Sequence, residues 1–311
     1  MLHLRVVSPT ASTPAVLALL TADPGTANLA LLPGASLDPT GDLIFCDVAR
    51  EAVNDVIAGL RRLDVHHAGS IAVENIDVSV SDAAAAAERN AKGYGSDAAV
   101  WEEVEDRVRN ESALTAGYVA FIVVAALIAV VGLLEDSPIL IVGAMVVGPE
   151  FGPISGLAVG IFKRRADRVQ VAARTLAIGL TVGVVASFVA TGLALVSGLV
   201  PAEFSPHEQP LTGFIVEPSV LSLVVALLAG VAGTLSLTQS KSGALIGVLI
   251  SVTTIPAVAA MGVSAALVQP DNFVGATVQL AVNVAALLVA AVLTLVVQRA
   301  VWGRVLARRQ R

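Results

Sequence analysis

Residues 137–162 are apolar enough to cross a membrane, but two prolines interrupt them. About 20 apolar residues span the roughly 30 Å hydrocarbon layer of a bilayer as a helix. Pro149 and Pro153 each remove a backbone donor, and proline also clashes with the preceding helical turn. The sequence therefore predicts a membrane segment that bends or opens near these prolines. Freed backbone groups at that depth must be buried in protein or line a wet cavity.

One acidic residue, Glu150, lies between the two prolines. A charge at the centre of a bilayer costs at least about 2.5 kcal/mol on insertion scales, so such residues are functional-site candidates by default. Protonation, water or a bound cation can offset this cost. A purely structural hydrogen-bonding role for Glu150 is an equally good interpretation of the sequence.

The composition places the chain among membrane proteins, because 56% of its 311 residues are hydrophobic and only 14% are charged. The apolar blocks begin only after a mixed N-terminal part. We therefore expect a cytoplasmic domain over residues 1–80, a linker and amphipathic helix over 81–112, a membrane domain over 113–298 and a basic cytoplasmic tail over 299–311.

The same counts exclude several classes of function. The net charge of −6 and the acidic N-terminal part argue against a nucleic-acid partner. A single cysteine, Cys46, and four histidines without zinc spacing predict no metal site and no cofactor. The spans contain no Ser-His, paired-Asp or metal constellation, so we do not expect an enzyme.

The N-terminal part has the pattern of a small α+β domain. Strands are expected at 2–7, 27–32, 42–47 and 70–76, with helices at 12–22 and 49–63. The turn signals Pro33-Gly34 and 39–41 separate the second and third strands. This β-α-β-β-α-β order is that of a ferredoxin-like split βαβ unit. Such a domain could bind a small cytoplasmic metabolite or serve only for oligomerisation, and the sequence favours neither.

A linker and an amphipathic helix connect this domain to the first span. Residues 81–97 read as an Ala-rich linker ending in Lys92 to Gly95. Over 98–111, Val100, Trp101, Val104 and Val108 share one face and acids fill the other. We expect this helix to lie on neighbouring protein, with Trp101 as an interfacial anchor.

Six spans are expected, at about 113–134, 138–162, 169–199, 220–238, 243–268 and 273–298. Their connecting loops are strongly asymmetric in charge. The basic residues of the loops and tail are Lys163, Arg164, Arg165, Arg168, Lys241, Arg299, Arg304, Arg308, Arg309 and Arg311. The remaining loops contain acids and no Lys or Arg. The positive-inside rule therefore places both termini in the cytoplasm.

The two halves of the membrane domain are similar in sequence. Residues 123–134 and 224–235 are identical at seven of twelve positions, and each is followed by a polar turn and a Gly- and Pro-containing span. Three spans per half would give the halves opposite topology. We therefore expect a 3+3 inverted repeat, the arrangement of many secondary transporters.

The residues 136–153, DSPILIVGAMVVGPEFGP, together with the fifth and sixth spans, resemble the family called domain of unknown function 389. The resemblance covers about residues 100–298. It implies a bacterial or archaeal inner (plasma) membrane protein but no particular activity. In the family pattern the position of Glu150 is apolar, so this chain departs from it there.

Small residues recur along the second span. Gly148, Gly152, Gly156 and Gly160 fall every four residues, and Gly143 lies one turn further back. Such stripes let membrane helices approach closely, so we interpret them as packing surfaces. Gly179, Gly183 and Ser187 offer a complementary face on the third span.

We expect the functional site where the interrupted second and fifth spans cross. Its candidate residues are Gly148, Pro149, Glu150, Pro153, Thr254, Pro256, Gln279 and Asn283. The leading hypothesis is a transporter or channel for a small solute or ion, regulated by the cytoplasmic domain and assembled as a homo-oligomer. The alternative is a membrane-anchored sensor or scaffold that transports nothing.

Overall fold

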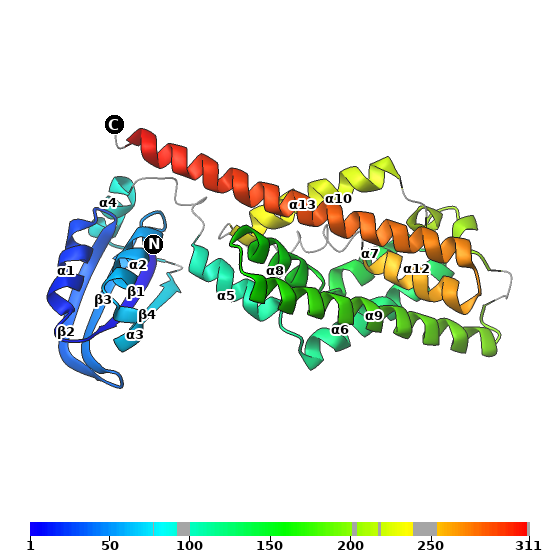
Figure 1. The fold of residues 1–311 in the computed structure, drawn as a ribbon, viewed down its shortest axis with the longest axis horizontal. Helices are drawn as coiled ribbons and strands as arrows, with labels where there is room; N and C mark the ends of the chain where they lie inside the picture. Colours follow the sequence, from blue (N-terminus) through cyan, green and yellow to red (C-terminus); the bar gives the residue numbers. More distant parts are fainter. Residues whose placement is uncertain (77, 92–99, 201–203, 217–218, 239–253, 310–311) are drawn as a thin grey trace. The chain divides into compact units, whose positions relative to one another are not determined.

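A computed structural model describes residues 1–309 except 77, 92–99, 201–203, 217–218 and 239–253 (Figure 1). The chain divides into two compact units. The first is mainly Met1–Val104, and the second is mainly Glu105–Leu237 with Ser242–Ala300. Each unit is described by itself.

The first unit contains one four-stranded sheet. Its strands are β1 (Leu2–Ser8), β2 (Thr26–Leu37), β3 (Thr40–Val48) and β4 (Ser70–Asn75), in the order β2-β3-β1-β4. Each neighbouring pair is antiparallel. The helices are α1 (Thr13–Ala22), α2 (Val53–Arg62), the short α3 (Val65–Ala68) and α4 (Asp82–Asn90). This order and pairing agree with the predicted split βαβ unit.

The core of this unit lies between the sheet and helices α1 and α2. Alternate residues of β1 and β3 are buried, including Leu4 and Ile44, as expected for strands with one covered face. Val16 and Leu20 of α1 and Leu60 of α2 pack against them. The periodic apolar residues of the sequence therefore form one core.

Two boundaries differ from the sequence prediction. Pro33-Gly34 is not a turn between strands but lies inside β2, where the pairing with β3 shifts register between Leu32 and Ser36. The predicted linker over 81–97 contains α4, because alanines favour helix and Ser81 caps it by accepting a hydrogen bond from the Ala84 amide at 3.2 Å.

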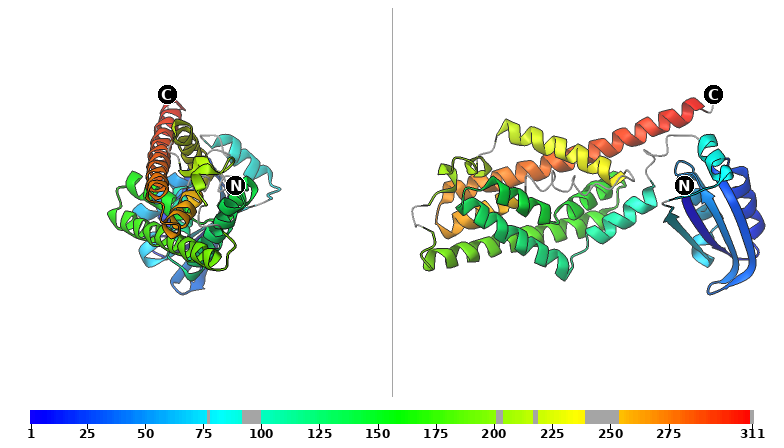
Figure 2. Two further views of the ribbon diagram at one scale, coloured as in Figure 1. Left: turned by 90° about the vertical axis from the view of Figure 1, so that its right-hand side faces the viewer. Right: turned by 180° about the vertical axis from the view of Figure 1, so that it is seen from behind.

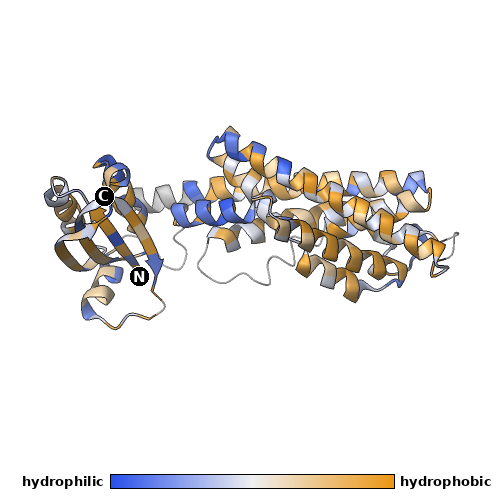
Figure 3. Ribbon diagram, turned by 90° about the horizontal axis from the view of Figure 1, so that it is seen from below, coloured by the Kyte–Doolittle hydropathy of each residue, from blue (hydrophilic) through white to orange (hydrophobic). Residues whose placement is uncertain are grey.

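The second unit is a bundle of apolar helices, coloured mostly orange in Figure 3. It follows α5 (Trp101–Glu111), which crosses from the first unit. The bundle helices are α6 (Ala116–Leu134), α7 (Pro138–Val147), α8 (Phe151–Phe162), α9 (Ala166–Val196), α10 (Val220–Thr238), α12 (Ile255–Ala266) and α13 (Pro270–Arg309). Short 3₁₀ turns at Pro206–Glu208 and Gly213–Val216 lie between α9 and α10. The long α9 and α13 are easily followed in Figure 2.

The described residues supply four or five candidate spans, where the sequence predicted six. Four helices, α6, α9, α10 and α13, are long and apolar enough to cross a bilayer. Helices α7 and α8 make a fifth if they count as one span, and they meet at an angle of 55°. The bend predicted near Pro149 is therefore present. The predicted span 243–268 lies partly outside the described residues, which contain only its 12-residue α12.

Close contacts at small residues give the directions of the helices around α9. A Cβ atom added at Gly183 of α9 would lie 2.7 Å from Val258 Cγ1 of α12, and one added at Gly262 would meet the Cβ atom of Ser187. Gly183 thus lies beside Val258 and Ser187 beside Gly262, so the residue numbers of the two helices increase in the same direction and α9 and α12 run parallel. Gly179 and Gly183 contact Tyr118 and Ile122 in the same way, so α6 is parallel to α9 as well.

Helix α8 runs the other way. A Cβ atom added at Gly160 would lie 2.9 Å from Val169 Cγ2, and one at Gly156 would lie 3.0 Å from the Cβ atom of Ala172. Because the residue numbers of α8 fall while those of the contacting residues in α9 rise, α8 is antiparallel to α9. Helices α8 and α12 therefore run in opposite directions, as Figure 1 also shows.

Candidate functional site

The break in the second span is three residues long. Helix α7 ends at Val147, and α8 begins at Phe151 with Glu150 in its N-cap position. The Glu150 side chain does not cap its own helix, and only 1% of the residue is exposed. The carboxylate is thus held inside the bundle and is available to groups on other helices.

The start of α12 lies against this carboxylate. Thr254 is the N-cap residue of α12, Pro256 lies in its first turn, and both are buried. The Thr254 hydroxyl donates a hydrogen bond to Glu150 Oε1 at 3.4 Å. A Cβ atom added at Gly148 would clash with the Glu150 carboxylate and lie 2.8 Å from Ile255 Cγ1. A larger residue at position 148 would therefore force the carboxylate and Ile255 to move.

Two helix N-termini therefore meet at one acidic side chain. The first amides of a helix have no partner within the helix, and its N-terminus carries roughly half a positive charge. A carboxylate at such an end gains about 0.3–1 kcal/mol at an exposed site and up to about 2 kcal/mol where it is partly buried. The N-termini of α8 and α12 can thus stabilise an ionised Glu150 away from water.

The polar neighbourhood extends to Tyr118, which sequence reasoning missed. Tyr118 lies in the first turn of α6, and the Glu150 carboxylate acts on its hydroxyl electrostatically. This hydroxyl is buried without a hydrogen-bond partner among the described residues, as is that of Ser187 on α9. No local sequence signal connects Tyr118 to residue 150, because the connection arises only when α6 packs beside α9.

The remaining predicted site residues are also buried. Gln279 and Asn283 lie on α13 and are 6% and 1% exposed. Gln279 Oε1 has no hydrogen-bond partner within the described part of the chain. Pro153 is buried in the first turn of α8, where a proline is tolerated, whereas Pro149 is partly exposed in the break.

The predicted packing glycines differ in their surroundings. A Cβ atom added at Gly152 would clash with the backbone of Glu111, and one at Gly156 would meet the Ser112 hydroxyl. Gly160 faces the start of α9, as described above. Gly143 is different, since no described atom lies within 4 Å of its added Cβ.

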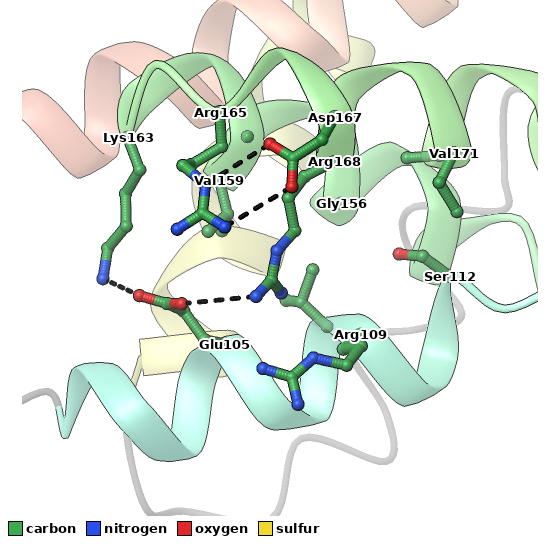
Figure 4. Close-up of a pocket in the computed structure, with 13 residues that line it drawn as sticks. Glu105, Arg109, Ser112, Gly156, Val159, Lys163, Arg165, Asp167, Arg168 and Val171 are labelled. Atoms are coloured by element: carbon green, nitrogen blue, oxygen red, sulfur yellow. Dashed lines mark hydrogen bonds and ion pairs between the residues drawn. The ribbon is translucent and has the colours of Figure 1, made fainter. Parts of the chain in front are cut away.

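A charged cavity lies at the other end of α8 (Figure 4). Its volume is about 300 Å³, and α5, α8 and α9 form its walls. Its lining residues are Glu105, Val108, Arg109, Ser112, Gly156, Val159, Gly160, Lys163, Arg165, Asp167, Arg168, Val171 and Ala172. The sequence marked the basic residues only as an orientation signal, because α5 is distant from them along the chain.

One group of possible metal ligands occurs on the first unit, where the sequence predicted none. Asp64, His66 and His67 are exposed, and their ligand atoms lie within 4.8 Å of one another among the described residues. Exposed side chains at a short helix are common without an ion, so this cluster alone does not define a metal centre.

Long apolar helices that follow a small α+β unit define a multi-pass membrane protein. The sequence profile of the family described as Domain of unknown function (DUF389) matches residues 145–289. Over this stretch the chain is similar to that family, which confirms the resemblance found in the sequence. No curated protein and no solved structure gives a significant match.

Proposed function

We propose that this protein is a membrane transporter for a small solute or ion, in which Glu150 carries a proton or a cation. The observation that carries this proposal is the meeting of two helix N-termini at the buried Glu150–Thr254 hydrogen bond. Secondary transporters place their sites between interrupted helices near the bilayer midplane, where helix ends present free backbone groups.

A 3+3 inverted repeat is part of this proposal, and the element bounds support it. Ala116 and Val220 begin α6 and α10, which are each 19 residues long. Phe151 and Ile255 begin α8 and α12, which are each 12 residues long. Ala166 and Pro270 begin α9 and α13. The two residues of each pair are 104 positions apart in the sequence. The opposite directions of α8 and α12 are those that inversion requires.

The turns after α8 and α12 have the same backbone conformation. Lys163 and Leu267 both have φ −88° and ψ 1°. The next residues have positive φ angles, 55° for Arg164 and 57° for Val268. Each turn closes with a backbone hydrogen bond spanning five residues, of 2.8 and 2.9 Å. The turn after α6 is built in the same way, with a φ of 47° at Asp136 and a hydrogen bond of 2.8 Å from the Ser137 amide to the Gly132 carbonyl, so this common helix ending does not by itself distinguish the pairing.

Under this pairing Glu150 and Thr254 are counterparts, since they too are 104 residues apart and both are N-cap residues. The hydrogen bond between them then lies on the axis that relates the two repeats. A site on this axis faces both halves equally, which is the location that alternating access needs.

Glu150 supplies the chemistry. Ionised, it accepts hydrogen bonds and balances the positive ends of α8 and α12. Protonated, it becomes a donor and removes the charge that makes a buried carboxylate costly. The side chain can therefore take up a proton or a small cation from one side and release it to the other.

The proposal includes the topology and partners expected from the sequence. Six spans place both termini in the cytoplasm of a bacterial or archaeal cell, with the basic residues 163–168 on that side. The N-terminal unit would bind a small metabolite or join copies of a homo-oligomer. A sensor or scaffold without transport activity is the alternative.

Flux measurements in proteoliposomes test the proposal. Proton and sodium fluxes would be followed with entrapped indicators under an imposed gradient, and Glu150→Gln would be compared with Glu135→Gln. Glu135 is an exposed acid at the end of α6 and serves as the matched control. The amide keeps the volume of Glu150 but cannot titrate.

We expect Glu150→Gln to abolish the flux or its pH dependence without changing folding, while Glu135→Gln behaves as the wild type. Equal fluxes in the two variants would contradict the role of Glu150. A wild-type protein that moves neither ion, alone or with added amino acids and nucleotides, would favour the alternative.

A further inference from the structure

The cavity between α5, α8 and α9 combines an apolar wall with a charged rim (Figure 4). Val108, Val159 and Val171 supply apolar surface from three different helices. The rim carries four cationic side chains and two carboxylates. These are Lys163, Arg109, Arg165 and Arg168 against Glu105 and Asp167. The lining residues therefore carry an excess of positive charge, part of which is balanced by Asp106, which pairs with Arg109 at 3.1 Å.

Glu105 lies at the centre of this charge pattern. Its two carboxylate oxygens contact Lys163 and, at 3.8 Å, Arg168. Arg165 is engaged separately by Asp167 at 3.3 Å. Burial acts to raise the pKa of Glu105, but the hydrogen bond and charge of Lys163, with the neighbouring arginines, outweigh burial and lower it. Glu105 is therefore the anion that this group of cations holds.

We propose that this cavity binds a phosphate-bearing ligand, with Arg168 and Lys163 as its principal contacts and Glu105 as the internal anion that it displaces. Phosphate suits this rim because arginine presents paired donors that match its oxygens. A carboxylate shared by two cations already marks the place of a bound anion, and a phosphate carries more charge and more acceptor oxygens.

The apolar wall indicates what the rest of the ligand resembles. Val171 is 57% exposed on α9, next to the cavity, so an apolar surface continues from the lining to the outside of the bundle. An anionic phospholipid fits this surface best, with its headgroup at the rim and its chains along the valines. A free phosphate compound would share the rim contacts but not the apolar ones.

A binding experiment on the full chain in neutral detergent tests this proposal. The unfolding midpoint would be measured against increasing dioctanoyl phosphatidylglycerol, dioctanoyl phosphatidylcholine or inorganic phosphate. Arg168→Gln would be compared with Arg164→Gln, which removes the same charge from the turn just before α9 at a position that does not line the cavity. Glu105→Gln removes the internal anion.

We expect phosphatidylglycerol to stabilise the wild type and Arg168→Gln to weaken this binding at least about tenfold, since a hydrogen bond to a charged group contributes about 1.5–3 kcal/mol. Arg164→Gln should bind within about twofold of the wild type, and Glu105→Gln should bind more tightly. Stabilisation by inorganic phosphate as well would assign a free phosphate compound.

Three results would overturn the proposal: equal weakening by the two arginine variants, equal stabilisation by phosphatidylcholine, or no stabilisation by any probe. Weaker binding in Glu105→Gln would also contradict it, because a purely structural Glu105 would be needed to hold the cavity together. None of these outcomes depends on whether the protein transports a solute.

Discussion

Replacing Gly262 by alanine should separate α12 from α9, the helix that it packs against most closely. The added Cβ would lie 2.7 Å from both the Phe188 amide nitrogen and the Val184 carbonyl oxygen, and it would also clash with the Cβ atom of Ser187. Two of these neighbours are backbone atoms within a long helix, so they cannot rotate away. The helices must move apart instead.

The size of the effect follows from two opposing contributions. Overpacking of this kind costs about 1–3 kcal/mol. Alanine also favours the helix over glycine by about 1 kcal/mol. Where the new methyl group meets no other atom, this gain in helix stability is not opposed by an overpacking cost. Gly192 of α9 is such a position, since no described atom lies within 4 Å of its added Cβ. This gain is common to both helix-interior positions and cancels in the comparison, so Gly262→Ala should be less stable than Gly192→Ala by about 1–3 kcal/mol.

Thermal unfolding in detergent measures this difference. For a chain of this size class, 1 kcal/mol shifts the midpoint by about 2–4 °C, so the two variants should differ by about 2–12 °C. Refolded monodisperse protein and matched detergent concentrations make the comparison valid. Equal midpoints for the two variants would refute the close α9–α12 contact and, with it, the parallel direction inferred for these helices.

Three further predictions concern other parts of the chain. The Glu105 ion pairs should stabilise the second unit fully above pH 4.5, the ordinary pKa, and lose this effect as the pH falls through the lowered folded value. Acid titration should therefore weaken the wild type more than Glu105→Gln, in which only the other carboxylates such as Asp167 still titrate. Burial, with Asp47 nearby, raises the pKa of the Cys46 thiol from 9.0 to about 12. Its alkylation at pH 8 should therefore be about 10³-fold slower than in unfolded protein, and rapid labelling of the native protein would contradict this. Asp136 accepts hydrogen bonds from the amide and hydroxyl of Thr212 at 2.9 and 2.8 Å. Asp136→Ala should therefore lower the free energy of unfolding by about 1.5–3 kcal/mol in chemical denaturation, and an unchanged midpoint would exclude these hydrogen bonds.

The N-terminal unit was predictable because local signals agree with its tertiary structure. Alternating apolar residues gave the strands, and the spacing around Val53 and Leu60 gave α2. The register shift in β2 was not predictable, since Pro33-Gly34 is a turn signal in most contexts. Helix α4 was missed because alanine-rich segments are ambiguous until a cap such as Ser81 is recognised.

In the membrane unit, composition predicted apolar spans, of which the described residues supply four or five of the six expected, and proline predicted the bend at Pro149. The sequence also paired residue 150 with the start of α12, because both positions interrupt apolar segments. The aligned residues 123 and 224 are 101 apart, whereas the helix starts paired in the proposed repeat are 104 apart, and Val, Ala and Leu align by chance at many offsets.

The charged cavity could not be predicted, because it joins segments about 60 residues apart whose pairing no local pattern specifies. Lys163 and Arg168 look like ordinary orientation signals until α5 brings Glu105 between them. The same is true of Tyr118, whose relation to Glu150 depends on how α6 packs. Contacts of this kind depend on helix packing, which a single sequence does not encode in its periodicity.

Helix α8 connects two chemically different places. Its N-terminus carries Glu150 and its C-terminus leads to Lys163, and its 12 residues make a rod about 18 Å long. Near its N-terminus, the Ser112 hydroxyl donates a hydrogen bond to the Gly152 carbonyl at 2.9 Å, so the segment after α5 contacts α8 as well. Any coupling between the two ends is reciprocal by thermodynamic linkage: if an anion bound beside Lys163 shifts the proton affinity of Glu150, protonation of Glu150 shifts anion binding by the same factor.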